Sequence, residues 1–170
     1  NDFLQSNDVT PVETDLGEYI LQLRDEAPSH IVAPAIHVTK QEVADLFRAA
    51  HRDLPKDRRL DDARSLIGEA RTVLRRQFQT ADVGITGANF LIAETGSSVI
   101  VTNEGNGDLT QTLAKAHIVV ASIEKVVPTL NDAATLLRVL ARSASGQEFS
   151  AYTTFSTGPR RNGDLDGPGD

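Results

Sequence analysis

The chain has 170 residues, of which 39% are hydrophobic and 24% charged, proportions that are typical of a globular protein. Its formal net charge of -7 repels phosphate backbones, so the composition argues against nucleic-acid binding. No apolar run approaches the roughly 20 residues needed to cross a bilayer, and the first residues lack the pattern of a signal peptide. The absence of cysteine excludes disulfides, thiolate catalysis and cysteine metal sites, and we expect a cytoplasmic protein without a membrane partner.

The first half of the sequence predicts two short strands and three helices. Residues 9–13 are expected to form an edge strand, because Pro11 cannot donate to a central ladder. A short helix over 18–24 is followed by a β-branched stretch, 30–36, that predicts a second strand.

Two longer helices follow in the sequence. Thr39 and Glu42 have the spacing of a capping box, which begins a helix that reaches about residue 50. After a charged loop, apolar residues recur at helical spacing and predict a longer helix. They are Ala63, Leu66, Ile67, Ala70, Val73, Leu74 and Phe78.

The second half is richer in strand signals. Apolar runs at 89–93 and 98–102 are separated by a turn of hairpin length, and residues 117–123 predict a strand that is buried on both faces. Asn131 is expected to cap a further helix, and residues 149–155 predict a last strand. We expect a single domain over 1–158 and a flexible tail over 159–170, which is rich in Gly, Pro and Asp.

The order of these elements indicates an α/β fold. Strands that alternate with helices predict a mostly parallel sheet, to which the hairpin adds an antiparallel pair. The expected fold class is therefore α/β, with a mostly parallel sheet and an antiparallel hairpin.

Two polar segments that contain glycine are attached to predicted strands. The first runs over 84–89 and continues, after an apolar run, at 93–96, and the second runs over 102–107. In open α/β sheets ligands bind at strand ends, where glycine lets the backbone approach an anion. Neither segment has the dinucleotide or P-loop spacing. The alternative is that both are ordinary turns, since Asn106-Gly107 is a common hairpin sequence.

Glu94 is the candidate catalytic residue. It follows an apolar run, and partial burial would raise the pKa of its carboxyl toward the range that is useful for acid–base or nucleophilic chemistry. The alternative is a solvated residue in a hairpin turn.

The four histidines show no metal-binding pair, so no metal site is expected. We expect His51 to be solvated and His117 to be structural. His37, just after a predicted strand, and Lys125, beside Glu124, are candidates to border the ligand site.

These residues lead to the hypothesis of one pocket for a small anionic ligand. Glu94 and Asn103 are about eight strand residues apart, which in a straight hairpin is more than 25 Å at roughly 3.3 Å per residue, so a single pocket requires a twist or break near Gly96. The proposed ligand-binding residues beside Glu94 are Thr86, Gly87, Asn89, Thr95, Gly96, Thr102, Asn103, Glu104, His37 and Lys125.

Six segments, taken in order, resemble the LUD (lactate utilization) domain family, and within it the lactate utilization protein B family. They are Thr14–Ile20, Pro28–His37, Ala81–Phe90, Ile92–Gly96, Val101–Gly107 and Ile123–Thr129. The resemblance implies a fold similar to the sugar-phosphate isomerase and coenzyme A transferase group. It also implies a part in the oxidation of L-lactate to pyruvate, together with other lactate-utilization subunits.

Full-length relatives implied by the resemblance carry 4Fe-4S clusters in a ferredoxin-like part. Clusters of that kind are held by cysteine thiolates, so no cofactor is expected in this cysteine-free chain. The leading hypothesis is a binding and assembly module that is not active alone. The alternatives are a transferase or isomerase that works through Glu94, and a regulatory domain for a small anion.

Overall fold

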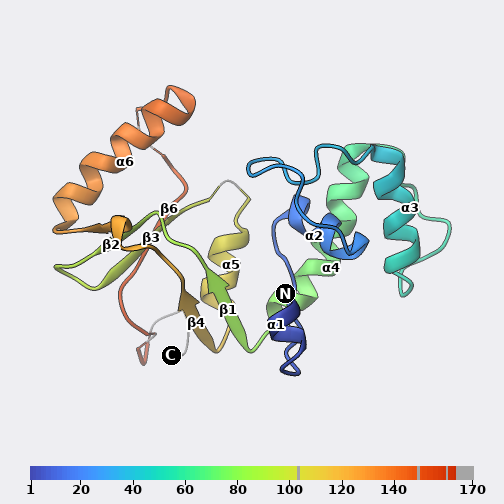
Figure 1. The fold of residues 1–170 in the computed structure, drawn as a ribbon, viewed down its shortest axis with the longest axis horizontal. Coiled ribbons are helices and arrows are strands. Elements are labelled where there is room, and N and C mark those ends of the chain that lie inside the picture. Colours follow the sequence, from blue (N-terminus) through green and yellow to red (C-terminus); the bar gives the residue numbers. More distant parts are fainter. Residues whose placement is uncertain (103, 149, 160, 164–170) are drawn as a thin grey trace. The chain divides into compact units, whose positions relative to one another are not determined.

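A computed structural model describes the chain except residues 103, 149, 160 and 164–170 (Figure 1). The chain divides into two compact units, Asn1–Gln77 and Phe78–Asp170. We call them the helical unit and the sheet unit. The expectation of one domain over 1–158 with a flexible tail stays a prediction, and most of that tail lies outside the described residues.

The helical unit contains only helices and loops among its regular elements. Its elements are α1 (Asp2–Gln5), α2 (Leu16–Arg24), α3 (Lys40–Ala50) and α4 (Ala63–Thr80), the last of which extends into the first residues of the sheet unit. Asp15 caps α2 through the backbone N–H of Gly17, and the capping box of Thr39 and Glu42 is present as expected. Phe47 of α3 is completely buried, and Leu66, Glu69, Ala70 and Leu74 are the buried residues of α4.

The two strands expected in this region do not form. Residues 9–13 have no strand pairing, and residues 30–36 turn back on themselves. The Ser29 backbone N–H and hydroxyl both donate to the Pro34 carbonyl, at 3.2 and 2.9 Å, and His30 Nδ1 accepts from the backbone N–H groups of Val32 and Ala33. These local bonds replace the ladder that a strand would need, and Ile31 is left 97% exposed.

The sheet unit contains two sheets. β1 (Val83–Thr86) pairs in parallel with β4 (Ala116–Val119). The second sheet has the order β5-β2-β3-β6, where β2 pairs in parallel with β5 but antiparallel with β3, which is antiparallel to β6. The four strands are β2 (Phe90–Ile92), β3 (Ser97–Val101), β5 (Val126–Val127) and β6 (Thr153–Ser156). The α/β class is confirmed, but this larger sheet is mixed and not mostly parallel.

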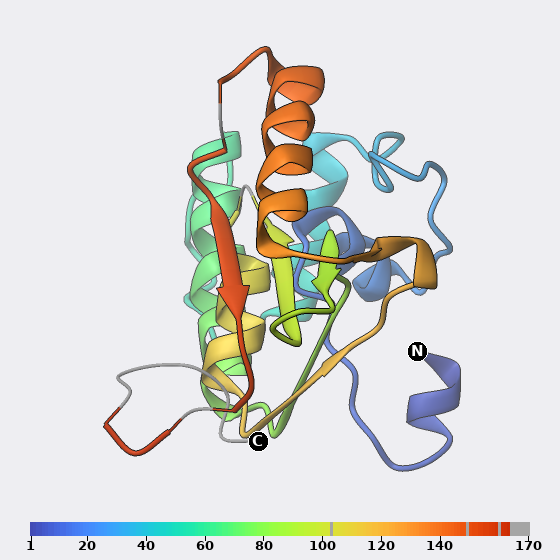
Figure 2. The ribbon, with the colours of Figure 1, turned by 90° about the vertical axis from the view of Figure 1, so that its left-hand side faces the viewer.

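Three helical segments complete the sheet unit: α5 (Asn106–Leu113), the 3-10 helix η1 (Ile123–Lys125) and α6 (Leu130–Ser145). The core of the larger sheet is formed by Ile92, Val99 and Val127, which pack with Ala133 of α6. Figure 2 shows α6 beside the hairpin of β2 and β3.

Several expected boundaries in this unit are corrected. Thr129, and not Asn131, caps α6 through a capping box with Asp132. β4 is not buried on both faces, because Ile118 is half exposed and the other residues of the strand are only partly buried. The hairpin signal at Asn106-Gly107 begins α5 instead, and β6 is shorter than the expected strand over 149–155. No helix of the described residues is both long and apolar enough to cross a membrane.

Candidate functional site

Gly84, in the first polar segment, allows α5 to lie directly on β1. A Cβ atom at Gly84 would be 2.0 Å from the carbonyl oxygen of Thr110, a distance at which only glycine fits. The C-terminal end of α5 lies at the start of β1, because the backbone N–H of Lys115 donates to the Asp82 carbonyl at 3.1 Å. At 1.5 Å per residue α5 is about 12 Å long, so its N-terminus lies near the carboxyl ends of β1 and β4 (Figure 1).

Several predicted ligand-binding residues lie toward this end of the sheet unit. The Thr86 hydroxyl is 2.8 Å from Nε2 of His117, and the Thr102 hydroxyl donates to Oδ1 of Asn106 at 3.2 Å. Asn89 lies between β1 and β2, where its Oδ1 accepts from the Val101 N–H at 2.8 Å. We call this group the strand-end site, made up of Thr86, Gly87, Asn89, Thr102, Asn106, Gly107 and His117.

The chemistry of the strand-end site is neutral and polar. Burial lowers the pKa of His117 below its ordinary value, which favours the uncharged imidazole beside Thr86. A side chain at Gly107 would place its Cβ 2.8 Å from Cδ1 of Ile100, so glycine keeps the first turn of α5 close to β3. Backbone N–H groups at a helix N-terminus favour anions and polar oxygens, so the arrangement suits a small oxygen-rich ligand.

Glu94, Thr95 and Gly96 lie in the hairpin turn, away from the strand-end site. The Glu94 carboxylate accepts a hydrogen bond from the Leu130 N–H at 3.1 Å, which satisfies a backbone donor in the first turn of α6. The Thr95 hydroxyl is 2.6 Å from that of Ser97. These contacts give Glu94 a helix-capping role at the surface.

The single pocket that we expected from the sequence is therefore not assembled. β3 pairs regularly from Ser97 to Val101, without the break that such a pocket requires. Thr102 is five residues beyond Ser97, or roughly 17 Å along an extended strand. Asn103 lies outside the described residues, and Glu104 is exposed in the loop that leads to α5.

The two bordering candidates belong to other elements of the chain. His37 belongs to the helical unit, where its Nε2 is 2.6 Å from the Glu26 carboxylate and its Nδ1 is 2.8 Å from the Ser29 hydroxyl. Lys125 ends η1 and is exposed just before β5. Neither residue is among those that form the strand-end site.

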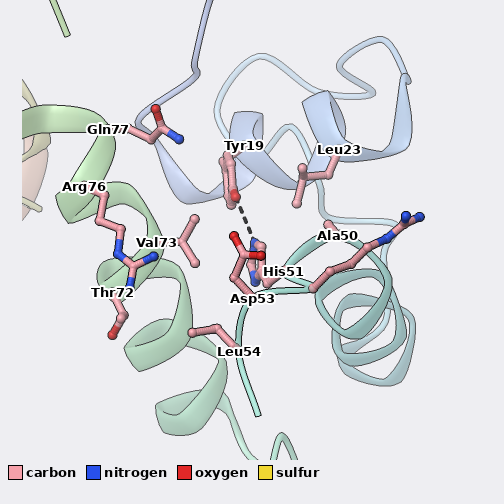
Figure 3. Close-up of a pocket in the computed structure, with 11 residues that line it drawn as sticks. Tyr19, Leu23, Ala50, His51, Asp53, Leu54, Thr72, Val73, Arg76 and Gln77 are labelled. Carbon is pink, nitrogen blue, oxygen red and sulfur yellow. Dashed lines mark hydrogen bonds between the residues drawn. The ribbon is translucent and has the colours of Figure 1, made fainter. Parts of the chain in front are cut away.

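His51 differs most from what its sequence context predicts. It was expected to be solvated, but only 7% of it is exposed. Its Nδ1 is 2.7 Å from the Glu69 carboxylate, and its Nε2 is 2.8 Å from the Tyr19 hydroxyl (Figure 3). The one sequence signal was the position of Glu69, a carboxylate within the apolar face of the long helix.

The described residues contain no group of three or more histidine, aspartate or glutamate side chains that could hold a metal ion. Because the whole chain also lacks cysteine, its donor set does not fit an iron–sulfur cluster.

The family described as "LUD domain" matches residues 1–170, and the chain belongs to this family.

Particular relatives are named lactate utilization protein B. The chain is 49% identical over 169 residues to the protein of that name from Geobacillus thermodenitrificans and 46% identical over 173 residues to that from Bacillus subtilis. Each alignment covers 99% of this chain, which spans about a third of the relatives' length, 35% and 34% respectively. A solved structure of a DUF162 family protein from Deinococcus radiodurans matches with a TM-score of 0.44 and 19% identity, over 89% of this chain and 88% of that one.

Proposed function

We propose that this chain is the LUD domain of a lactate utilization protein B-like subunit and takes part in the oxidation of L-lactate to pyruvate. Its proposed role is that of a ligand-binding and assembly module. The observation that carries the proposal is the identity of 46–49% with proteins named lactate utilization protein B, along 99% of the chain. The aligned region includes both polar segments that contribute to the strand-end site.

The strand-end site is the proposed binding place for a small anionic ligand within the sheet unit. Close packing of α5 on β1, which depends on Gly84, holds the first turn of the helix beside Thr86 and His117. For the topology we propose the sugar-phosphate isomerase and coenzyme A transferase type, in which ligands also bind at strand ends.

Electron transfer is assigned by this proposal to other parts of the system. Since the chain has no cysteine, 4Fe-4S clusters would be held by other segments of a longer protein or by the other lactate-utilization subunits. The chain's own residues would bind and position ligand and partners. The cytoplasm is the proposed location.

A domain exchange tests the proposal. In a Bacillus subtilis strain that lacks lactate utilization protein B, the matching third of that protein is replaced with this chain, and growth on L-lactate is measured. We expect the chimera to restore growth, because nearly half of the residues in the exchanged part are identical. The same protein with this third deleted should not restore it.

Site variants of the chimera link growth to the strand-end site. Thr86→Val keeps the shape of the side chain but removes its bond to His117, and should slow growth on L-lactate. Thr135→Val is the matched control, because the exposed Thr135 hydroxyl donates within α6, to the Asn131 carbonyl. A chimera that accumulates to normal levels but does not support growth would contradict the proposal.

A further inference from the structure

The helical unit contains a cavity that is lined by residues of this unit. Its volume is about 400 Å³, which lies within the range of about 300–1,000 Å³ usual for small-molecule pockets. Residues of α2, the C-terminal end of α3, the loop after it and α4 line the cavity (Figure 3). All of them belong to the helical unit.

A buried network of polar side chains forms one wall of this cavity. Tyr19 and His51 line it, and behind His51 the Glu69 carboxylate accepts from Nδ1 at 2.7 Å. Arg58 donates to the same carboxylate through Nε at 2.6 Å and through Nη2 at 3.1 Å. Burial by itself raises the pKa of Glu69, but the bonds from Arg58 and His51 outweigh it and hold the pKa below its ordinary value.

The hydrogen-bond directions in the network follow from this charge. An ionised Glu69 only accepts, so Nδ1 of His51 carries the hydrogen of their bond. Nε2 then faces Tyr19, at 2.8 Å from its hydroxyl. Burial and the Glu69 charge raise the pKa of Tyr19, which therefore stays a phenol that can both donate and accept.

The Tyr19 hydroxyl can accordingly form a hydrogen bond with either a hydroxyl or a carbonyl oxygen of a ligand. When it donates to a bare Nε2, its oxygen can accept from a ligand hydroxyl. When its hydrogen turns to a ligand carbonyl instead, the same hydroxyl can donate to an oxo acid. One residue can in this way pair with a hydroxy acid and with the corresponding oxo acid.

The remaining lining residues favour a small acid. Arg52 and Arg76 outnumber Asp53, so the charged side chains in the lining sum to +1, which favours an anion. Leu23, Leu54 and Val73 supply apolar wall for a short carbon chain. Arg76 lies on the α4 side in Figure 3, and its guanidinium has the donor geometry that a carboxylate needs.

We propose that this cavity is a binding site for a short monocarboxylate that carries an oxygen on C2, with Tyr19 as the partner of that oxygen and Arg76 as the partner of the carboxylate. The choice of acid rests on the proposed function, whereas the location and the roles of Tyr19 and His51 rest on the cavity and its hydrogen bonds. L-lactate and pyruvate are the probes that fit this description. Propionate has the same carbon chain without the oxygen on C2.

Titration of the purified chain with the three acids, followed by backbone amide NMR, tests the proposal. L-lactate and pyruvate should bind saturably, about tenfold more tightly than propionate, because propionate leaves the Tyr19 hydroxyl unpaired. Amide shifts should move at Tyr19, His51 and Thr72, which line the cavity.

Three variants separate the roles. Tyr19→Phe keeps the aromatic ring and should abolish the preference for L-lactate over propionate while leaving propionate affinity unchanged. Arg76→Gln should weaken the binding of all three acids about tenfold, since each loses a charged partner of its carboxylate. Arg75→Gln is the matched control, because Arg75 is an exposed cation on the same helix that does not line the cavity.

Other outcomes would overturn this inference. Absence of saturable binding at millimolar concentrations would do so, as would a Tyr19→Phe variant that keeps its preference while circular dichroism shows it folded. Shifts confined to residues 84–107 would place the acid at the strand-end site, which refutes the cavity but supports the proposed function. Conversely, binding in the cavity together with a chimera that fails to grow would support the cavity as a binding site and refute the proposed role in lactate oxidation.

Discussion

The helical unit and the sheet unit position polar side chains by different physical means. In the helical unit, a buried carboxylate is held by side chains from other elements: Glu69 of α4 bonds to His51 and Arg58. In the sheet unit, positions without a side chain set the geometry, because Gly84 and Gly107 let α5 approach the strands beside it. The first arrangement depends on charge and the second on space, so different substitutions should disrupt each.

The largest effect is expected where the buried charge loses its partner. Glu69→Gln removes the carboxylate that Arg58 and His51 share, and should lower the free energy of unfolding by about 3–5 kcal/mol at neutral pH. Urea denaturation measures this value, with Glu124→Gln on the exposed 3-10 helix as the control. A midpoint equal to that of the parent would show that the network contributes little to stability.

The parent and the Glu69→Gln variant also test how the stability from Glu69 depends on pH. The pKa of Glu69 is lowered in the folded state, so its contribution is fully present above the ordinary glutamate pKa and is lost as the pH falls through the folded-state pKa. The stability difference between the parent and Glu69→Gln should therefore shrink in acid. A difference that stays constant down to strongly acidic pH would contradict this assignment.

The next largest effect concerns space in the sheet unit. Gly84→Ala would place a methyl group 2.0 Å from the Thr110 carbonyl oxygen and force α5 away from β1, at a cost of about 1–3 kcal/mol. Gly68→Ala is the matched control, because nothing lies within 4 Å of its Cβ position in α4. That control should gain about 0.5–1 kcal/mol from helix propensity. Equal stabilities for the two variants would refute the close approach of α5.

A smaller effect is expected from Glu18, whose titration opposes that of Glu69. Burial, then the hydrogen bond and negative charge of Asp15, raise the pKa of Glu18 to about 7. The folded protein therefore binds more protons than the unfolded chain between the ordinary glutamate pKa and about 7, and stability falls as the pH rises through this window. Glu18→Gln removes that loss.

Measurements at two pH values test this assignment. At about pH 8, Glu18→Gln should be more stable than the parent by on the order of 1 kcal/mol, because solvent screens a partly exposed carboxylate. At about pH 5 the two proteins should have similar stabilities. A parent that is the more stable of the two at the higher pH would exclude a raised pKa for Glu18.

The smallest effect is expected at Glu94 in the hairpin turn. Glu94→Ala removes the acceptor for the Leu130 N–H and should cost about 0.5–1 kcal/mol, whereas Glu94→Gln keeps an acceptor oxygen and should cost less. In the chimera, Glu94→Gln should support growth on L-lactate as well as the parent does. Complete loss of growth with normal protein levels would favour the alternative of a transferase or isomerase that uses this carboxylate.

Local interactions allowed much of the fold to be predicted from the sequence. The capping box of Thr39 and Glu42, the periodic residues of α4 and the hairpin of β2 and β3 depend on groups a few positions apart, and all three are present. The glycines also identified the two polar segments as candidate ligand-binding regions. The strand-end site draws residues from both, and His117 from the next strand.

The tertiary structure decided the interactions that join distant elements. Residues 30–36 have strand-forming side chains, but with no pairing partner the Ser29 and His30 bonds close a turn. The separation of Glu94 from Thr102 follows from the straight register of β3, and only the structure could show that the twist or break required for one pocket is absent. His51 is buried because Tyr19 and Glu69, 32 and 18 positions away, satisfy both of its ring nitrogens. Burial of a polar group is favourable only when such partners are in place, and folding alone brings them there.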